Sequence, residues 1–367
     1  MTSKARQLAD LGGDTDNLED VSSAYGSGAL SNRNLIINGA MQVAQRGTSF
    51  TPTSDNTYTL DRWRSRYFGS GSGRFSVSQE TSSTPDDFPY AIKATVTTTD
   101  TSGTYGYSIS YTTEGNTLNG TAFGTSSAKD ITLSFWVRSS VTGTYCVSHR
   151  NGAATKSFVS EYSINTADTW EYKTITVSGE TSGTWSTDNT AGLLIDFGLG
   201  GQTSKTTTAN AWQTGNYVYS SNQTDWINTS GATFYLTGVQ LEVGDTATPF
   251  EHRSYGQELA LCQRYYETSN TNGQRLPYTT VAFYNTGSAF GYFQWQVEKR
   301  AIPTVTYNGA NWNLYKASSG LTETGVASDG ISTKAVCFVL NGSGFPSGEA
   351  GFADNRTDDA IVADAEL

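Results

Sequence analysis

The stretch ITLSFWVRSS, residues 131–140, decides the fold class. Ile, Leu, Phe and Val stand at positions 131, 133, 135 and 137, and Thr, Ser, Trp and Arg stand between them. Because successive side chains of a strand point to opposite faces of a sheet, a period of two predicts a half-buried β-strand. The stretch therefore favours a sheet with one face packed on a core.

Similar signals continue on both sides of this stretch. Ahead of it, NLIINGAMQVAQRG (34–47) holds an Asn-Gly turn at Asn38-Gly39, and TWEYKTITVSG (169–179) and ATFYLTGVQLEVG (232–244) follow it. Gly, Asn and Ser separate the apolar runs at spacings typical of a β-sandwich, and no helical periodicity intervenes. We therefore predict a single jelly-roll sandwich body over residues 31–254, with Trp63 in its core and Asp61 paired with Arg62 at its edge.

Composition agrees with an all-β protein and excludes several functions. Apolar residues make up 36% of the chain and charged residues 16%, and the formal net charge is -11. Nucleic-acid binding and attraction to an anionic membrane both need a cationic excess, which is missing here. Three cysteines far apart, without a CxxC pair, indicate neither a disulfide framework nor a zinc site. We expect no cofactor, no metal, no nucleic acid and no membrane insertion.

Three further segments flank the body. Residues 1–30 are small, acidic and glycine-bearing, which is typical of a docking segment followed by a linker. Residues 255–269 predict a short connecting helix, and residues 270–367 return to strand patterns that predict a smaller C-terminal β-sandwich, with AIVADAEL (360–367) as a terminal strand. The N-terminus lacks the apolar region of a signal peptide, so synthesis in a cytoplasm is expected.

Several stretches in order along the chain resemble tail-fibre proteins of marine podophages, such as those that infect cyanobacteria. They are TSKARQLADL (2–11), NLIINGAMQVAQRGTSF (34–50), YTLDRWR (58–64), DITLSFWVRSSVTGTYCVS (130–148), DTWEYKTITVSG (168–179) and FYLTGVQLEVGDTATPFEHRSYGQELALCQRYYE (234–267). The central region also resembles jelly-roll carbohydrate-binding modules, although Met41-Gln42 stands where those modules carry an acidic residue. A calcium ion is therefore not expected at that position.

The resemblance implies an elongated homotrimeric fibre in a phage virion. Its N-terminus would dock on a tail adaptor or nozzle protein, through residues that include Lys4, Arg6, Leu8 and Leu11. Its distal C-terminal domain would bind a host cell-surface polysaccharide such as lipopolysaccharide or O-antigen. Residues after 270 resemble the family less closely, as expected if fibre tips diverge.

The cluster PFEHRSYGQELALCQRYYE (249–267) offers reactive side chains, but its pattern favours packing over catalysis. Cys262 lacks a catalytic signature and lies at helical spacing from Leu259 and Tyr266. This spacing predicts one apolar face on a helix too short to be stable alone, so it must pack on something. We predict a joint between body and tip at Leu259, Cys262 and Tyr266, where three copies would meet around the axis of a trimer, and no catalytic residues. His149, in CVSHRNG, is expected at a surface turn.

Aromatic and amide side chains in the C-terminal part are the candidates for glycan binding. Sugar rings stack on Tyr and Trp faces, and neighbouring polar groups bind the hydroxyls. The candidate residues are Tyr284, Asn285, Tyr292, Trp312, Asn313 and Tyr315. The turn-like stretch NGANWNLY predicts that Trp312 and Tyr315 are the most exposed, whereas Trp136 and Trp170 are expected to be structural.

Together these observations predict a non-enzymatic, receptor-binding tail fibre. Two alternatives remain open at this point. One is a virion decoration protein with a carbohydrate-binding jelly roll, and the other is a glycan-depolymerising tailspike, because paired carboxylates are brought together in space and not in sequence.

Overall fold

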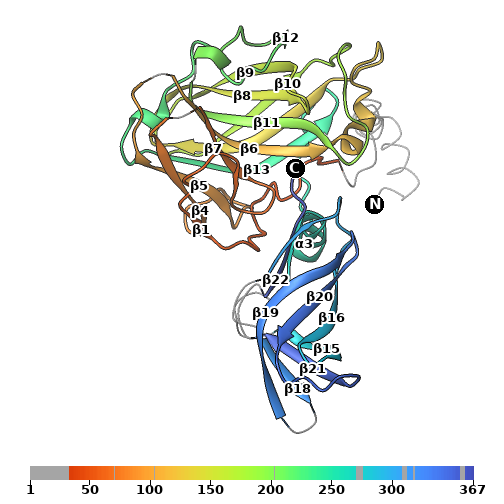
Figure 1. Cartoon of the computed structure of the whole chain (residues 1–367). Helices are drawn as coiled ribbons and strands as arrows, with labels where there is room; N and C mark the ends of the chain where they lie inside the picture. The colour runs from red at the N-terminus through yellow and green to blue at the C-terminus, as the bar shows by residue number, and fades with distance from the viewer. Residues whose placement is uncertain are drawn as a thin grey trace, which may run out of the picture.

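A computed structural model describes residues 33–69, 71–102, 104–201, 203–269, 276–307, 312–316, 319–355 and 360–367. The body and a smaller C-terminal unit form an elongated molecule, with helix α3 between them (Figure 1). The predicted docking residues Lys4, Arg6, Leu8 and Leu11 lie outside the described residues. Within the described ranges, no helix is long and apolar enough to cross a membrane.

The body is a sandwich of two antiparallel sheets, as predicted. One sheet has the order β1 (Ser49–Phe50), β4 (Arg74–Glu80), β5 (Ala91–Thr98), β13 (Thr233–Val243), β7 (Ile131–Ser139), β10 (Glu171–Val177). The other has the order β12 (Trp212–Thr214), β9 (Lys156–Ile164), β8 (Gly143–Asn151), β11 (Ala191–Gly200), β6 (Gly106–Glu114), β3 (Arg64–Phe68), β2 (Thr57–Tyr58). Three short 3₁₀ segments connect strands: η1 (Gly115–Thr121), η2 (Thr203–Lys205) and η3 (Trp226–Asn228).

The alternating stretch has its apolar face in the core as predicted, but it is not half-buried along its whole length, because Thr132 and Ser134 on the other face are also buried. In β7 the apolar positions, Ile131 among them, are fully buried between the sheets, whereas Trp136 and Arg138 are only partly buried on the outer face. Trp63 is also fully buried, and its ring centre lies 5.1 Å from that of Tyr111 and 6.2 Å from that of Phe197. The core therefore sits between the two sheets, with Trp63 at its centre.

The first strand signal of the body is an irregular segment held by a turn. Met41 donates its backbone N–H to the Asn38 carbonyl (3.1 Å), which closes the predicted Asn-Gly turn. The Trp63 indole N–H donates to the same carbonyl (3.0 Å). A side chain at position 39 would overlap the Val239 carbonyl, so the turn lies directly against β13.

The C-terminal unit differs from the predicted sandwich, because six strands close on themselves into a barrel. The order is β15 (Leu276–Asn285), β16 (Ser288–Gln294), β20 (Ala335–Gly342), β19 (Ser319–Ile331), β18 (Trp312–Lys316), β21 (Ala350–Asn355). A second, small core fills it, with Phe283, Trp312, Leu314 and Phe338 among its members. A closed sheet has no unpaired edge strand, so none of these six strands is free to pair with another chain.

Helix α3 is shorter than predicted. It runs Tyr255–Gln263 and begins with a capping box in which Ser254 and Gln257 bond each other's backbone N–H. Tyr266 belongs to the next strand, β14 (Tyr266–Thr268), and not to the apolar face of the helix. Strand β14 pairs with β22 (Ile361–Asp364), which also pairs with β17 (Thr304–Tyr307), so tertiary pairing replaces the last helical turn. The terminal strand predicted in AIVADAEL is confirmed.

Candidate functional site: the outer face of the barrel

Four of the six candidate glycan-binding residues reach the outer surface of the barrel. Tyr284 is 70% exposed and Tyr292 57% exposed, and Asn285, next to Tyr284 in the sequence, is also exposed. Tyr315 is half-buried, and Asn313 donates its side-chain amide to the Asp354 carboxylate (3.0 Å).

Trp312 corrects the prediction that it is the most exposed of the set. Its side chain is 1% exposed and lies in the barrel core, 5.1 Å from the ring of Phe338. The turn-like sequence before it does not extend to Trp312 itself, which begins β18 with its side chain directed inward. Trp312 is therefore a core residue and not a ligand-binding one.

The strand register brings three aromatic residues to one level of the outer surface. Thr280 on β15 is opposite Phe352 on β21, and Phe352 is opposite Tyr315 on β18. On the other side, Val281 is opposite Gly291, so Thr280 is next to Tyr292 on β16. We call Tyr292, Thr280, Phe352 and Tyr315 the aromatic belt. Adjacent strands are about 4.8 Å apart, so the rings of Tyr292 and Phe352 begin about 10 Å apart.

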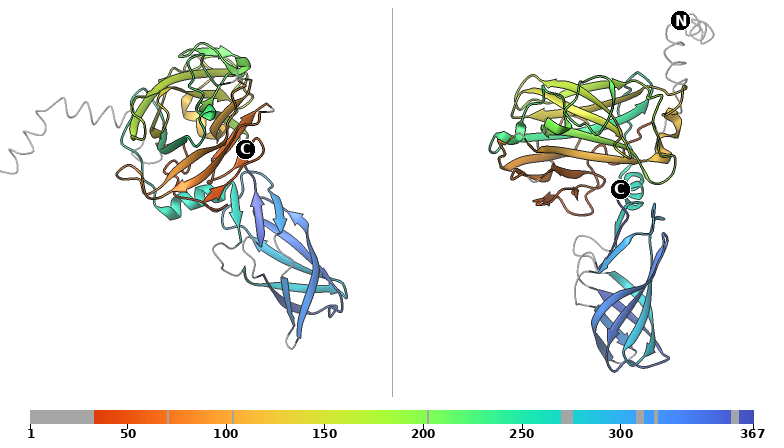
Figure 2. Two further views of the ribbon diagram at one scale, coloured as in Figure 1. Left: turned by 90° about the vertical axis from the view of Figure 1, so that its left-hand side faces the viewer. Right: turned by 45° about the horizontal axis from the view of Figure 1, so that its top comes forward.

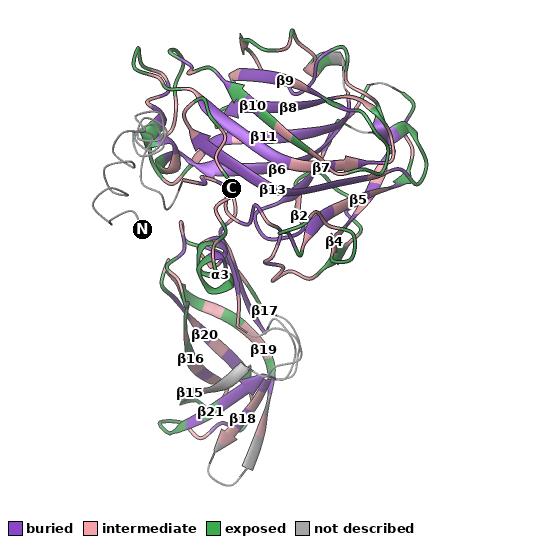
Figure 3. Cartoon of the chain, turned by 180° about the vertical axis from the view of Figure 1, so that it is seen from behind, coloured by how far each residue is buried: buried purple, intermediate pink, exposed green. Residues whose placement is uncertain are grey.

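Phe352 is 55% exposed and is the aromatic member that sequence reasoning missed, and Thr280 was missed as well. The sequence does show that Ala350 and Phe352 share one face of a strand and that Gly351 and Ala353 share the other. This alternation does not show which of the two faces is the outer one. The structure decides this, because a side chain at position 351 would overlap the Phe283 ring in the core. The burial pattern on the outside of these strands is visible in Figure 3.

A pair of aromatic side chains outside the belt, Tyr284 on β15 and Phe290 on β16, also lies on the outer face of the barrel. The rings of Tyr284 and Phe290 meet edge to face, with centres 5.6 Å apart. Phe290 is opposite Ala282 on β15 and Val339 on β20, both on the outer face. The outer surface of β15, β16, β20 and β21 thus presents rings and small apolar groups, which can stack on the apolar faces of sugar rings.

The outer face of the seven-stranded sheet of the body, in contrast, is covered by other residues of the body, among them the buried Tyr219. The Tyr219 ring packs where Gly106 and Gly198 leave room, because a Cβ at either position would meet it. Beneath this cover, Asp196 is fully buried and bonded to Arg150 and Ser108. Burial raises the pKa of Asp196, but the two cations Arg150 and Arg66 lower it by more, so it stays ionised.

A hollow on the body edge is a weaker binding candidate. Its volume is about 430 Å³, and its lining is Glu161, residues 206–209 and residues 220–222. The lining side chains are Glu, Thr, Ala, Ser and Asn, so they offer hydrogen bonds but no aromatic wall. The barrel surface combines rings with neutral polar groups and is therefore the better candidate for a glycan.

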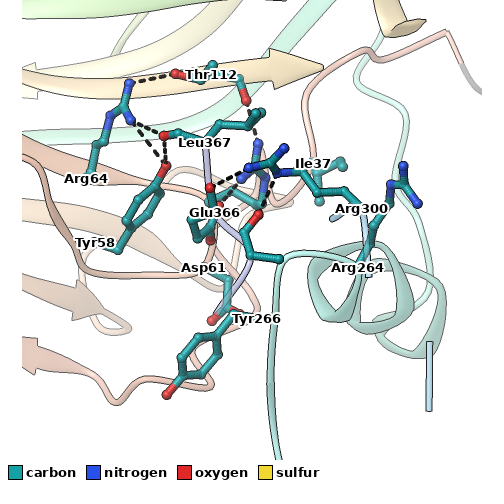
Figure 4. Close-up of polar contacts among 12 residues, drawn as sticks. Ile37, Tyr58, Asp61, Arg64, Thr112, Arg264, Tyr266, Arg300, Glu366 and Leu367 are labelled. Carbon is teal, nitrogen blue, oxygen red and sulfur yellow. Dashed lines mark hydrogen bonds and ion pairs between the residues drawn. The ribbon is translucent and has the colours of Figure 1, made fainter. Parts of the chain in front are cut away.

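Contacts between the body and the barrel are made by residues 365–367 as well as by α3 and the residues after it. Figure 4 shows Glu366 and Leu367 between the body and the residues that follow the helix. The Glu366 carboxylate is bonded to the Arg62 guanidinium and lies 3.3 Å from that of Arg46. Arg64 and Tyr58 both donate to the Leu367 main-chain oxygen. This final segment therefore fastens the barrel to the body.

Arg62 is the centre of the joint and corrects the predicted pairing with Asp61. Its guanidinium also donates to the Thr112 carbonyl and lies 3.5 Å from the centre of the Tyr265 ring. Burial acts to lower the pKa of Arg62, but the Glu366 carboxylate raises it well above its usual value. Asp61 instead accepts both from the backbone and from the side chain of Gln45 (2.6 Å each).

The three predicted joint residues lie on α3 and β14. Cys262 on α3 is fully buried, Leu259 on α3 is half-buried, and Tyr266 on β14 stacks against the Arg46 guanidinium at 3.6 Å. Burial raises the pKa of the Cys262 thiol well above its usual value, so the thiolate needed by a nucleophile is disfavoured.

Two further ion pairs complete the joint around this centre. Arg264 forms a bidentate pair with Glu114 of the body (2.7 and 2.9 Å), and buried Lys299 pairs with buried Glu267. Arg300 donates to the Ala365 and Glu366 carbonyls and to that of Asn189 in the body (3.0 Å). Sequence reasoning missed Arg62, Arg264 and Arg300 because their partners are far away along the chain.

His149 also differs from its prediction. It lies in β8 and is fully buried between the sheets, not at a surface turn. Burial lowers its pKa to about 4, so it is neutral in the core. Among the side chains that the structure describes, no three His, Cys, Asp or Glu residues are grouped to hold a metal ion.

Comparison with known proteins gives no family. No family model matches the chain, and no curated protein matches it. A domain of bacteriophage CBA120 tailspike protein 4 aligns with 57% of this chain at 11% identity and a TM-score of 0.32, over only 21% of its own length. The module TmCBM61, in complex with β-1,4-galactotriose, aligns with 58% at 10% identity and a TM-score of 0.30, over 99% of its length. The family 22 carbohydrate-binding module of Clostridium thermocellum Xyn10B aligns with 57% at 9% identity and a TM-score of 0.29, over 100% of its length. Similarity at this level does not assign a function.

Proposed function

We propose that this chain is the host-attachment protein of a phage tail fibre, and that its barrel binds a polysaccharide of the bacterial surface without cleaving it. The observation that carries the proposal is the aromatic belt on the outer face of the barrel, at the far end of an elongated molecule (Figure 2). Tyr292 and Phe352 are more than half exposed there. Large exposed aromatic groups in a patch mark a binding surface.

The resemblance noted from the sequence supports the virion location. The stretches that carry it supply the joint: Arg46 comes from AQRG, Arg62 from LDRWR, and Tyr265 from CQRYYE. A joint of buried ion pairs holds the barrel in a fixed orientation on the body, which suits a protein that presents a receptor-binding tip. In this proposal the chain is a homotrimer, and residues 1–30 attach it to a tail adaptor.

The test compares belt variants with a matched tyrosine on the body. Labelled protein is incubated with a bacterium that the full chain binds, and the apparent dissociation constant is measured. Loss of one stacked ring costs about 1.4 kcal/mol, so Tyr292→Ala should weaken binding about tenfold, and Phe352→Ala similarly. Tyr172→Ala removes a ring that is 46% exposed on the body and should leave binding unchanged.

Three outcomes would contradict the proposal. Equal effects of the belt and body variants would remove the barrel as the receptor-binding unit and favour a decoration protein that binds through its jelly roll. Shortened polysaccharide chains after incubation with the protein would show a depolymerase. A monomeric mass of the purified protein in solution would contradict the trimeric fibre.

A further inference from the structure

The surface around the aromatic belt is poor in charge. Strands β15, β16 and β20 contain no Asp, Glu, Lys, Arg or His in their sequences, whereas β18 contains one charged residue, Lys316, beside Tyr315. The nearest acid on β21, Asp354, is 1% exposed and bonded to Asn313. In a chain with a formal net charge of -11, this is a locally neutral surface.

The polar groups at the margin of this surface are also neutral. Asn285 and Ser288 lie at the hairpin between β15 and β16, and Ser288 is opposite Asn341 on β20. The Thr280 side chain is exposed between Tyr292 and Phe352. Hydroxyls and amides donate and accept hydrogen bonds, and this suits sugar hydroxyls better than carboxylates or sulfates.

Anionic sugars are recognised differently. Carboxylate and sulfate groups are bound by Arg and Lys, because charge-assisted hydrogen bonds offset their desolvation. Among the side chains that the structure describes, the belt includes no such group, and Lys334 on the same unit is paired with Glu298 at 3.8 Å. The net negative charge of the chain also repels a polyanion over about 8–10 Å at ordinary ionic strength.

We propose that the aromatic belt binds an uncharged polysaccharide, whose sugar rings stack on Tyr292 and Phe352 while Thr280 and the amides at the margin bind its hydroxyls. The inference rests on the proposed function of the barrel and names the class of glycan. Polymers rich in uronic acids or sulfate are excluded as ligands of this surface. A second copy of this chain is the competing occupant, because rings of this kind also form protein interfaces.

The experiment uses the full chain and a panel of polysaccharides, with binding measured by calorimetry. Dextran, laminarin and galactan are the neutral probes; dextran sulfate and alginate are the anionic ones, and dextran with dextran sulfate is a pair that differs only in charge. We expect binding to at least one neutral polymer, about tenfold weaker for Tyr292→Ala. The affinity should be unchanged between about 50 and 500 mM salt, because no charges are paired in the complex.

A gain-of-function variant keeps the test independent of folding losses. Thr280→Lys places a cation in the middle of the belt on an exposed position, and it should create salt-sensitive binding to dextran sulfate that the native chain lacks. Binding of the native chain to anionic polymers alone, or to no neutral polymer, overturns the inference.

The outcomes separate this inference from the proposed function. If Tyr292→Ala and Phe352→Ala abolish binding to cells while the native ligand proves anionic, the attachment function stands and the neutral-glycan inference fails. If these variants leave cell binding intact, the proposed function fails as well. If they change the mass of the protein in solution instead of its affinity for polymers, the belt is an interface between copies of the chain, and the inference is overturned.

Discussion

Replacement of Glu366 by Gln tests whether the end of the chain fastens the barrel to the body. The Glu366 side chain is 4% exposed and lies between the guanidinium groups of Arg46 and Arg62, which are 9% and 1% exposed. The amide keeps the size of the side chain but leaves two buried cations without their shared anion. Removing one partner of a buried ion pair costs about 3–5 kcal/mol.

This free energy should be lost from the joint and not from the body core. The core of the sandwich runs from Ile36 to Leu241 and does not include Glu366. The expected result is therefore a faster local opening of residues 361–367, by a factor of at least about 100, since each 1.4 kcal/mol is a factor of ten. Hydrogen exchange followed by mass spectrometry measures this directly, and the exchange of β7 peptides should not change.

The matched control is Glu298→Gln in the loop between β16 and β17. Glu298 pairs with Lys334 at 3.8 Å, and the two side chains are 56% and 71% exposed. Exposed pairs of this kind contribute about 0–1 kcal/mol, so exchange at the joint should stay as in the native chain. Equal exchange in the Glu366 and Glu298 variants would refute the argument that buried charge fixes the joint.

Three other changes have definite expected results. Burial lowers the pKa of His149 to about 4, below its ordinary value of about 6.5. The stability of the native chain should therefore be complete above pH 6.5 and should fall by about 3 kcal/mol as the pH is lowered to 4, because the unfolded chain binds a proton that the folded chain does not. In His149→Phe this part of the pH dependence should be missing when the free energy of unfolding is measured with denaturant at both pH values. A methyl group at Gly256, in the first turn of α3, meets open space, so Gly256→Ala should raise the free energy of unfolding by about 0.5–1 kcal/mol. At Gly39 it would overlap the Val239 carbonyl, so Gly39→Ala should lower the free energy of unfolding. A higher melting temperature for Gly39→Ala than for Gly256→Ala would contradict this reasoning. Trp312→Ala should cost about 3–5 kcal/mol and unfold the barrel before the body; a variant that only weakens glycan binding at native stability would restore the ligand-binding role that the sequence predicted.

The sequence could predict what depends on local periodicity. The alternation in residues 131–137 identified the buried face of β7, and the all-β class followed from this pattern with the composition. Tyr284 and Tyr292 were chosen as glycan candidates from the mixture of aromatic and amide residues around them, and both side chains are exposed. The inference for β7 needs only the two-residue period of a strand.

The rest depends on partners that are distant along the chain. Arg62 contacts Glu366 over 304 positions, and nothing near either residue indicates the other. Likewise, Tyr266 leaves the predicted helix because β22 pairs with it from the end of the chain. Trp312 and Phe352 have similar local sequences, rich in small and amide residues, yet barrel closure directs one inward and the other outward. Periodicity divides a strand into two faces, but closure decides which face is the core.

The connection between the barrel and the body has a mechanical consequence. The described backbone passes from the body to the barrel once, through α3 and β14. Residues 365–367 follow β22, the neighbour of β14, and contact the body through hydrogen bonds and ion pairs such as those of Glu366 with Arg62 and Arg46. A pull on the barrel is therefore carried by covalent backbone at α3 and by noncovalent contacts at residues 365–367. Under load we expect these contacts to release first, which would turn a fixed barrel into one that hangs from α3 alone.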